Sequence, residues 1–284
     1  MVSRRRFCSL SAAAFSLPLV ASASEGGAIP LKFGHRQANM VEQTGPIVFE
    51  IARRIRGLSG VELQMIWKGQ DLSDHETTLA YKREANRWAV QVPSIAGIWS
   101  HGESIFNIGS ARQTIQRAIR AAELLGASVI LVALFDANCP NMSDESSYGP
   151  VVDLLQNVSS EAADAGVALG LETSLTPADD KKFVDLVNRS AVRIYYDATN
   201  KELAYPGQSV PGIQLLGQRI VQIHLKNEDR LLSEPAKVNW PAALRALQRI
   251  SYQGWYVFET KHQNPEQCVL ATQQNIDFVR TYSA

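Results

Sequence analysis

Eight short apolar runs, rich in β-branched and aromatic residues, alternate with amphipathic helical patterns after the first 30 residues of the chain. Most of the runs are nearly continuous in hydrophobicity rather than alternating, which is typical of parallel strands covered on both faces. The expected strands are 31–33, 61–67, 89–99, 128–135, 167–171, 192–196, 220–225 and 255–258. They recur about every 30 residues, which is the length of a βα unit.

The segments between these runs place apolar residues at helical spacing. Ile115 and Ile119 share one face of a helix that we expect to stop at Gly126, and similar patterns stop before Gly166 and Gly254. Glycine just past a helix end is the favoured left-handed cap. Eight such units predict an α/β fold, the (β/α)8 TIM barrel.

A doubly wound open sheet is the alternative fold. It would place a glycine-rich turn of the form G-x-G-x-x-G after the first strand, where this chain reads Gly34-His35-Arg36. Linkers, charge runs and low-complexity tracts do not divide the chain. We therefore expect one domain over residues 24–284.

Polar side chains end four consecutive strands of the expected barrel. The runs that begin at 167, 192, 220 and 255 end on Glu172, Asp197, His224 and Glu259. The carboxyl ends of barrel strands form one ring, so we expect these side chains to converge. A charged group at the end of a buried strand is costly unless it is paired or bound to a metal. Three carboxylates and an imidazole suit one divalent ion, either manganese, cobalt, magnesium or zinc, with manganese favoured.

A buried ion-pair network is the alternative reading of the same four residues. It is disfavoured because there is no arginine among the four to balance the carboxylates.

Composition narrows the class of partner. The chain of 284 residues carries 28 basic and 28 acidic side chains, and 45% of it is hydrophobic. A net charge of zero offers no basic footprint for nucleic acid, and the apolar content is too high for disorder. Three cysteines without a C-x-x-C pair argue against a disulfide scaffold and against a thiolate zinc site.

The first 23 residues carry an export pattern. Residues 3–7 read SRRRF, and an uncharged alanine- and serine-rich run follows that ends on ASA at 21–23. This order resembles a twin-arginine signal peptide, so it predicts passage through the twin-arginine translocation machinery to the periplasm or the medium. The alternative is a cytoplasmic N-terminal arm. Serine dilutes the run too much for stable membrane insertion.

Cleavage behind Ala23 would change the charge of the chain. It would leave 261 residues with 25 basic and 28 acidic side chains, a net charge of −3. Cys139 and Cys268 would remain, either paired or free.

Four segments resemble the strand ends of the xylose isomerase-like superfamily: GLE at 170–172, DATN at 197–200, QIHLK at 222–226 and VFE at 257–259. That superfamily includes tagatose and psicose 3-epimerases, hydroxypyruvate isomerase and endonuclease IV. The resemblance covers essentially all of residues 24–284 and is strongest from 167 to 261. It implies a TIM barrel with one divalent metal held by Glu172, Asp197, His224 and Glu259. In the epimerase branch it further implies that Glu172 and Glu259 form the acid/base pair.

One position departs from the pattern of this superfamily. The commoner D-x-x-H reads Asp197-x-x-Asn200 here. Endonuclease IV uses that histidine and several others for three zinc ions, a set that this chain does not supply. We therefore do not expect DNA repair.

The expected ring suits proton abstraction next to a sugar carbonyl through an enediolate. An isomerase or epimerase returns the proton, whereas a lyase or hydratase acting on a keto-sugar or 3-keto-glycoside would expel a leaving group one carbon further along. A non-catalytic sugar-binding barrel is a third possibility.

Other residues at the same rim are candidate substrate contacts. Lys226 follows His224 by two positions and faces the same side of its strand, and Arg230 resembles an arginine that contacts substrate in ketose epimerases. The remaining candidates are Asn200, His35, His101, Trp67 and Trp99, each of which has an alternative as a packing or loop residue.

Barrel enzymes that bind phosphates usually do so with the loops after strands 7 and 8. Here those loops, 227–239 and 260–263, contain no glycine to bring backbone N–H groups close to a phosphate. The expected substrate is therefore an unphosphorylated sugar or keto-sugar. A homo-oligomer is left open.

Overall fold

The structure, a computed structural model, describes residues 31–42 and 44–283. The predicted signal peptide at 1–23 lies outside the described residues. Eight parallel strands close into a barrel in the order β1-β10-β9-β8-β7-β6-β5-β2, and β2 pairs back with β1. They are β1 (Lys32–Arg36), β2 (Leu58–Gln64), β5 (Ser94–Ala96), β6 (Val129–Leu134), β7 (Ala168–Thr173), β8 (Val192–Asp197), β9 (Ile220–Leu225) and β10 (Trp255–Phe258). The predicted TIM barrel is confirmed.

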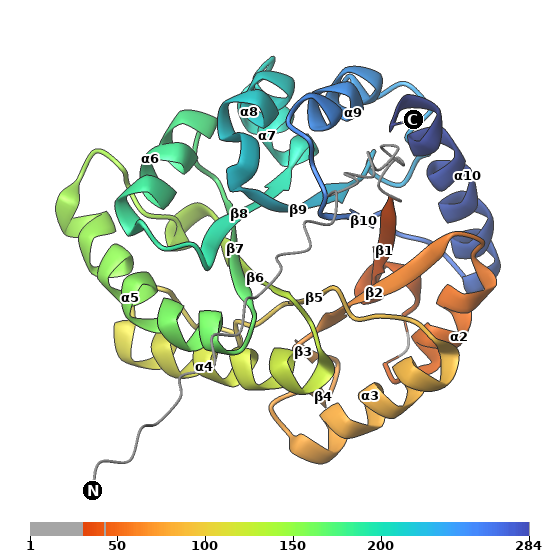
Figure 1. The fold of residues 1–284 in the computed structure, drawn as a ribbon, viewed down its shortest axis with the longest axis horizontal. Coiled ribbons are helices and arrows are strands. Elements are labelled where there is room, and N and C mark those ends of the chain that lie inside the picture. Colours follow the sequence, from red (N-terminus) through yellow and green to blue (C-terminus); the bar gives the residue numbers. More distant parts are fainter. Residues whose placement is uncertain (1–30, 43, 284) are drawn as a thin grey trace, which may run out of the picture.

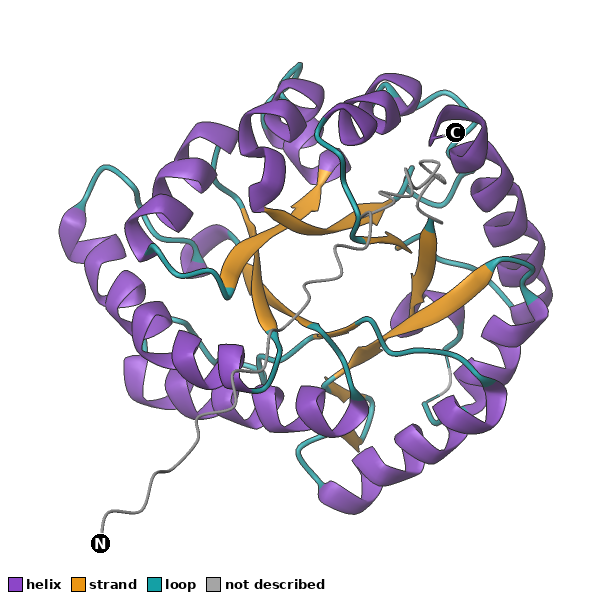
Figure 2. Ribbon diagram, viewed as in Figure 1, coloured by secondary structure: helices purple, strands orange, loops and turns teal. Residues whose placement is uncertain are grey.

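Helices surround the strands on all sides (Figure 1). They are α1 (Gln37–Met40), α2 (Ile47–Arg54), α3 (His75–Trp88), α4 (Ile108–Leu125), α5 (Glu145–Asp164), α6 (Pro177–Val187), α7 (Ala198–Ala204), α8 (Ser209–Leu216), α9 (Trp240–Arg249) and α10 (Pro265–Ser283). Two short 3₁₀ turns lie at Asp136–Asn138 and Gly217–Arg219. Figure 2 shows the two layers, with the strands inside and the helices outside. Among the described residues, the helices are too short or too polar to cross a membrane.

The strands bury both faces, as their continuous hydrophobicity predicts. On β6, Ile130 and Val132 pack in the large core between strands and helices, while Val129 and Leu131 pack with Tyr195 inside the barrel. This alternation follows from the two-residue period of a strand. Polar side chains therefore reach the barrel interior from inward-facing positions of the strands.

Two strand predictions need correction. Of the expected strand 89–99, only Ser94–Ala96 joins the barrel, because the flanking residues form the end of α3 and its loop. Trp67 was expected at the end of the second barrel strand, but it lies in a small hairpin of β3 (Ile66–Trp67) and β4 (Gln70–Asp71). The barrel strand itself ends at Gln64.

The glycines after the helices divide into two kinds. Gly126 caps α4 with a φ of 79°, as predicted. After α9, however, the left-handed residue is Ser251 rather than Gly254. A Cβ on Gly254 would lie 2.3 Å from the Tyr252 hydroxyl and 2.4 Å from the Val221 carbonyl oxygen, so that position requires glycine for close packing.

Candidate active site at the carboxyl ends of the strands

Three of the four predicted ligands converge inside the rim of the barrel. Glu172 is the penultimate residue of β7, Asp197 ends β8, and His224 lies opposite Asp197 in the register of β9. The Nδ1 atom of His224 lies 3.8 Å from Glu172 Oε1 and 4.0 Å from Asp197 Oδ2. All three residues are buried, and one donor atom of each lies within 4.8 Å of those of the other two.

Glu259, the fourth predicted ligand, lies beside this group but not in it. Its Oε2 is 3.5 Å from His224 Nδ1. Its other oxygen accepts a hydrogen bond from the Arg36 guanidinium, and Lys226 Nζ lies 2.8 Å from Oε2. The same ammonium is 2.8 Å from Asp197 Oδ2, so Lys226 bridges the two carboxylates.

Two cations outside the four predicted residues partly balance the carboxylates, as a buried ion-pair network would require. Arg36 from β1 and Lys226 from β9 supply the positive charge that the four predicted residues lack. With Glu62 counted, four carboxylates face two cations, which leaves a charge of −2 when His224 is neutral. The cations therefore compensate the cluster only in part.

Glu62 is a site residue that sequence reasoning missed. It lies on β2, its side chain is fully buried, and its Oε1 is 3.0 Å from His224 Nε2. Burial alone would raise the pKa of Glu62, but His224 and Arg36 outweigh burial and lower it. An ionised Glu62 accepts a hydrogen bond from Nε2–H, so Nδ1 is the nitrogen of His224 that faces the other carboxylates. Its strand reads LSGVELQ, which also contains the polar residues Ser59 and Gln64, so the local sequence did not single it out.

A chain of hydrogen bonds holds Glu62 in place from below. Its Oε2 accepts from Ser94 Oγ at 2.7 Å and from the Tyr195 hydroxyl at 2.6 Å. Gln222 Nε2 donates to these same two hydroxyls, at 2.6 Å and 2.9 Å. The carboxylate thus has its lone pairs satisfied although it is buried.

Asn200 reaches the cluster from the first turn of α7. Its Nδ2 donates to Glu172 Oε1 at 3.0 Å, and its backbone N–H donates to Asp197 Oδ1 at 2.8 Å. Asp197 is thereby the N-cap of α7, and its Oδ2 is left pointing to the cluster. Asn200 orients both predicted ligands.

The carboxylates of the ring differ in their affinity for protons. Burial raises the pKa of Glu172. Burial would also raise the pKa of Glu259, but His224, Arg36 and Lys226 lower it to about 2. Burial would lower the pKa of His224, but Glu259 and Glu62 raise it to about 10. In the absence of another cation, His224 therefore carries the positive charge that the cluster attracts.

One buried atom indicates that the cluster fits a metal ion. His224 Nδ1 has no hydrogen-bond partner among the described residues, and it faces Glu172 Oε1 and Asp197 Oδ2, of which the second is paired with Lys226. One imidazole and two carboxylates are donors that manganese, cobalt, magnesium and zinc accept in proteins. A divalent ion would also neutralise the residual charge of −2.

The remaining predicted contacts are spread more widely. His101 is exposed, and Arg230 is exposed and pairs with Glu228 at 3.4 Å. Trp99 is half-buried, with its Nε1 donating to the Ala133 carbonyl at 2.8 Å, and Trp67 is half-buried in the hairpin. These four residues have no direct bond to the cluster among the described contacts.

His35 lies behind the barrel wall rather than in the ring. It is fully buried, its Nε2 is 3.2 Å from His262 Nε2, and its ring lies against Phe258. Arg36, the next residue, points to Glu259, and successive strand residues face opposite sides. Arg36, rather than the predicted His35, is therefore the residue of β1 that faces the ring.

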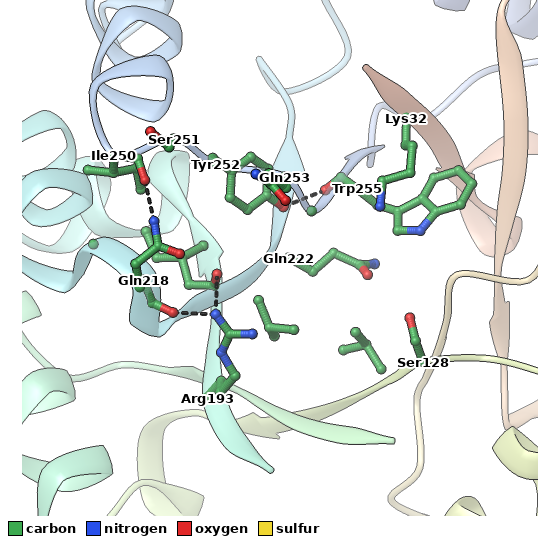
Figure 3. Close-up of a pocket in the computed structure, with 15 residues that line it drawn as sticks. Lys32, Ser128, Arg193, Gln218, Gln222, Ile250, Ser251, Tyr252, Gln253 and Trp255 are labelled. Atoms are coloured by element: carbon green, nitrogen blue, oxygen red, sulfur yellow. Dashed lines mark hydrogen bonds between the residues drawn. The ribbon is translucent and has the colours of Figure 1, made fainter. Parts of the chain in front are cut away.

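A cavity of about 400 Å³ lies at the opposite end of the barrel. Figure 3 shows Lys32, Ser128 and Trp255 around it, all from the starts of strands. Conserved chemistry in TIM barrels is found at the carboxyl ends of the strands, so this cavity is not the candidate active site.

Comparisons with known proteins agree with the fold. The D-allulose 3-epimerase from Methylomonas sp. is 16% identical, with a TM-score of 0.74 over 90% of this chain and 99% of that one. The 3-keto-D-glucoside 4-epimerase from E. coli is 16% identical, with a TM-score of 0.71 over 88% of this chain and 99% of that one. The D-psicose 3-epimerase from Clostridium cellulolyticum H10 is 15% identical, with a TM-score of 0.74 over 89% and 99%.

At these identities the likeness shows the fold. No functionally curated protein sequence shows significant similarity to the chain. The family model described as xylose isomerase-like TIM barrel matches residues 49–282. The chain therefore belongs to the xylose isomerase-like TIM barrel family.

Proposed function

We propose that the protein is a divalent-metal-dependent sugar isomerase or epimerase that moves a proton next to a carbonyl. The observation that carries the proposal is the convergence of Glu172, Asp197 and His224 beside Glu259 at the rim of the barrel, with the buried Nδ1 of His224 facing the carboxylates. An ion held there by Glu172, Asp197 and His224 would polarise the carbonyl of a sugar and stabilise negative charge on its oxygens.

The two glutamates carry the proton transfers in this proposal. Glu172 removes the proton from the carbon next to the carbonyl, and Glu259 returns one from the other side. Asn200, which donates to Glu172, fixes the direction of that carboxylate. Arg36 and Lys226 hold Glu259 and stand next to the space in which an oxyanion would develop.

Charge balance favours an uncharged substrate. Four carboxylates, two cations and a divalent ion sum to zero with His224 neutral, so the loaded site has no surplus charge for a phosphate. This supports the unphosphorylated sugar or keto-sugar expected from the glycine-free loops. The structural neighbours named above include epimerases of free ketoses and of a keto-glucoside.

A lyase acting on a 3-keto-glycoside is the second candidate. It uses the same base, because elimination also begins with removal of the proton next to the carbonyl. The observation that favours this alternative is the partly exposed Lys226, 20% exposed for its side chain, whose positive charge would stabilise the negative charge on a departing oxygen.

Product analysis separates the two candidates. Metal-free protein supplied with Mn²⁺, Co²⁺, Mg²⁺ or Zn²⁺ is incubated with free ketoses and with 3-keto-glucosides, and products are resolved by chromatography and mass. A product of unchanged mass and altered retention supports the isomerase or epimerase, whereas release of an aglycone supports the lyase. Complete absence of conversion over the whole panel, with metal bound, would contradict both.

A further inference from the structure

A second cluster of metal-binding side chains lies behind the barrel wall. His35 on β1, His262 after β10 and Cys268 in the first turn of α10 are all buried, and one donor atom of each lies within 4.8 Å of those of the other two. The three elements are neighbours in space, since β1 pairs with β10 and α10 runs beside them (Figure 1). The cluster is separate from the ring, because His35 faces away from Glu259.

The spacing of the two imidazoles matches a tetrahedral ion. His35 Nε2 and His262 Nε2 are 3.2 Å apart. Two nitrogens bound tetrahedrally to zinc at about 2.0–2.1 Å are about 3.4 Å apart. The two nitrogens are thus already at nearly the separation that a shared ion requires, and the rings would turn so that both lone pairs point at it. A zinc-bound thiolate would lie about 3.6 Å from each nitrogen, which a small rotation of Cys268 can reach.

The hydrogen bonds leave the correct nitrogen of His35 free to bind. Its Nδ1 is 3.1 Å from the carbonyl oxygen of Arg36, so Nδ1 carries the proton and Nε2 carries the lone pair. A backbone carbonyl on the far nitrogen is the common arrangement behind a metal-bound histidine. In the absence of metal, His262 satisfies that lone pair by donating its Nε2–H to it. On binding, the proton of His262 would move to its Nδ1, so that Nε2 of both imidazoles could bind the ion.

Protons compete weakly for the imidazoles. Burial and the neighbouring His262 lower the pKa of His35 to about 3, and burial lowers the pKa of His262 to about 4. Burial raises the pKa of the Cys268 thiol to about 12, so that thiol is inert until a cation displaces its proton. Binding would release this proton to solvent and leave the charges of the two imidazoles unchanged.

A cavity gives an ion access to the cluster. It measures about 590 Å³ and is lined by His262, Thr260, Gln267 and Ala271, among others. The Thr260 hydroxyl is buried and has no hydrogen-bond partner among the described residues. The cavity can also hold the water that completes four-coordination around three protein ligands.

We propose that His35, His262 and Cys268 bind one zinc ion. Two imidazoles and one thiolate are ligands that zinc accepts readily, whereas the carboxylate-rich ring suits harder ions. The bound ion would tie β1, the segment after β10 and α10 together at the seam where the barrel closes. A site of this kind has no C-x-x-C pair to mark it in the sequence, and its two histidines are 227 residues apart. The proposal does not depend on the proposed function.

Cobalt spectroscopy tests the site directly, because the ring contains no sulfur. Co²⁺ is added to tag-free, metal-free protein, and the near-ultraviolet absorption of a cobalt–thiolate bond is followed. We expect the band to saturate at one equivalent in the wild type, to be lost in Cys268→Ser and to persist in the matched control Cys139→Ser. Equilibrium dialysis with Zn²⁺ should give two ions per chain in the wild type and one in both Cys268→Ser and Asp197→Asn.

The outcomes that overturn the proposal are equally distinct. A wild-type protein saturated with Co²⁺ that shows no thiolate band contradicts it, as does a band that persists in Cys268→Ser. So does a dialysis ratio that is the same in Cys268→Ser as in the wild type. Circular dichroism identifies a variant that fails to fold. If Cys268→Ser does not fold, the presence or absence of the cobalt–thiolate band in the wild type and in Cys139→Ser decides whether the thiolate site exists. Failure of the proposed function would appear instead in Asp197→Asn and in the product analysis.

Discussion

The direction of a single imidazole decides what the ring can bind. His224 is held at Nε2 by Glu62, and Glu62 is held by Ser94 and Tyr195, so the ring orientation that aims Nδ1 at the carboxylates is fixed before any ion arrives. Ligand histidines whose outer nitrogen is held in this way bind more tightly, because neither the tautomer nor the ring orientation has to be selected on binding.

Replacing Glu62 should therefore weaken metal binding without touching a ligand. For Glu62→Gln we expect the Kd for Mn²⁺, measured by titration calorimetry, to rise about 10- to 100-fold. Glu103→Gln is the matched control, because Glu103 accepts its hydrogen bonds from Ser100 and Thr114 outside the ring. An unchanged Kd in Glu62→Gln, or an equal rise in both variants, would show that Glu62 does not orient His224.

The ring ligands could be predicted from the sequence, but the residues that surround them could not. Glu172, Asp197, His224 and Glu259 each follow an apolar run, so position alone marks them. Arg36 and Glu62 come from β1 and β2, and they reach the ring only because the barrel closes between β1 and β10. Closure is a property of the fold, and it leaves no local mark on either residue.

At the scale of elements, one buried ion pair joins α6, α7 and the end of β7. Lys201 Nζ lies 2.7 Å from Asp180 Oδ2 and donates to the carbonyl oxygens of Thr173 and Leu175 at 3.0 Å and 2.7 Å. Thr173 follows Glu172 directly, so this pair supports the strand end that carries the candidate base. The side chains of Lys201 and Asp180 are 5% and 1% exposed.

Replacing Lys201 should lower stability, because it leaves the buried carboxylate of Asp180 without its cation. For Lys201→Met we expect the free energy of unfolding, measured with urea, to fall by about 3–5 kcal/mol. Lys181→Met removes an ammonium from an exposed pair with Asp185, also 2.7 Å apart, and should cost less than about 1 kcal/mol. Similar losses in the two variants would contradict a structural role for the buried pair.

Element boundaries were predictable where an apolar run and a cap agree. The run at 255–258 and the end of α4 at Gly126 match the structure. The run at 89–99 does not match, because its mostly apolar residues include the left-handed end of α3 at Ala89, a loop and a short strand. Hydrophobicity marks burial there but does not distinguish a strand from the segments beside it.

For the whole molecule, the barrel brings eight distant strands to one ring, so an ion in the ring should stabilise the entire fold. At a Mn²⁺ concentration 100 times the Kd, binding contributes about 2.7 kcal/mol. For a chain of this size that raises Tm by about 5–10 °C. Differential scanning calorimetry of the wild type and of Asp197→Asn measures this effect. A Tm that rises equally in both would place the ion elsewhere.

The export pattern at the start of the chain stays a prediction, since it lies outside the described residues. The fold itself was predictable, because eight evenly spaced units leave few topologies open. The position of His35 was not predictable from the sequence. Successive residues of a strand alternate between the ring and the outer layer, so the register of β1 decides which of His35 and Arg36 faces inward.

The most direct test of the central claim is exchange of the substrate proton with solvent. Wild-type protein loaded with metal is incubated in D₂O with free ketoses and 3-keto-glucosides, and deuterium on the carbon next to the carbonyl is measured by mass spectrometry. We expect incorporation by the wild type and by Glu103→Gln, and a rate at least about 10²-fold lower in Glu172→Gln and in Glu259→Gln. Undiminished incorporation in both glutamate variants, or none by the metal-loaded wild type over the whole panel, would contradict proton transfer at this ring.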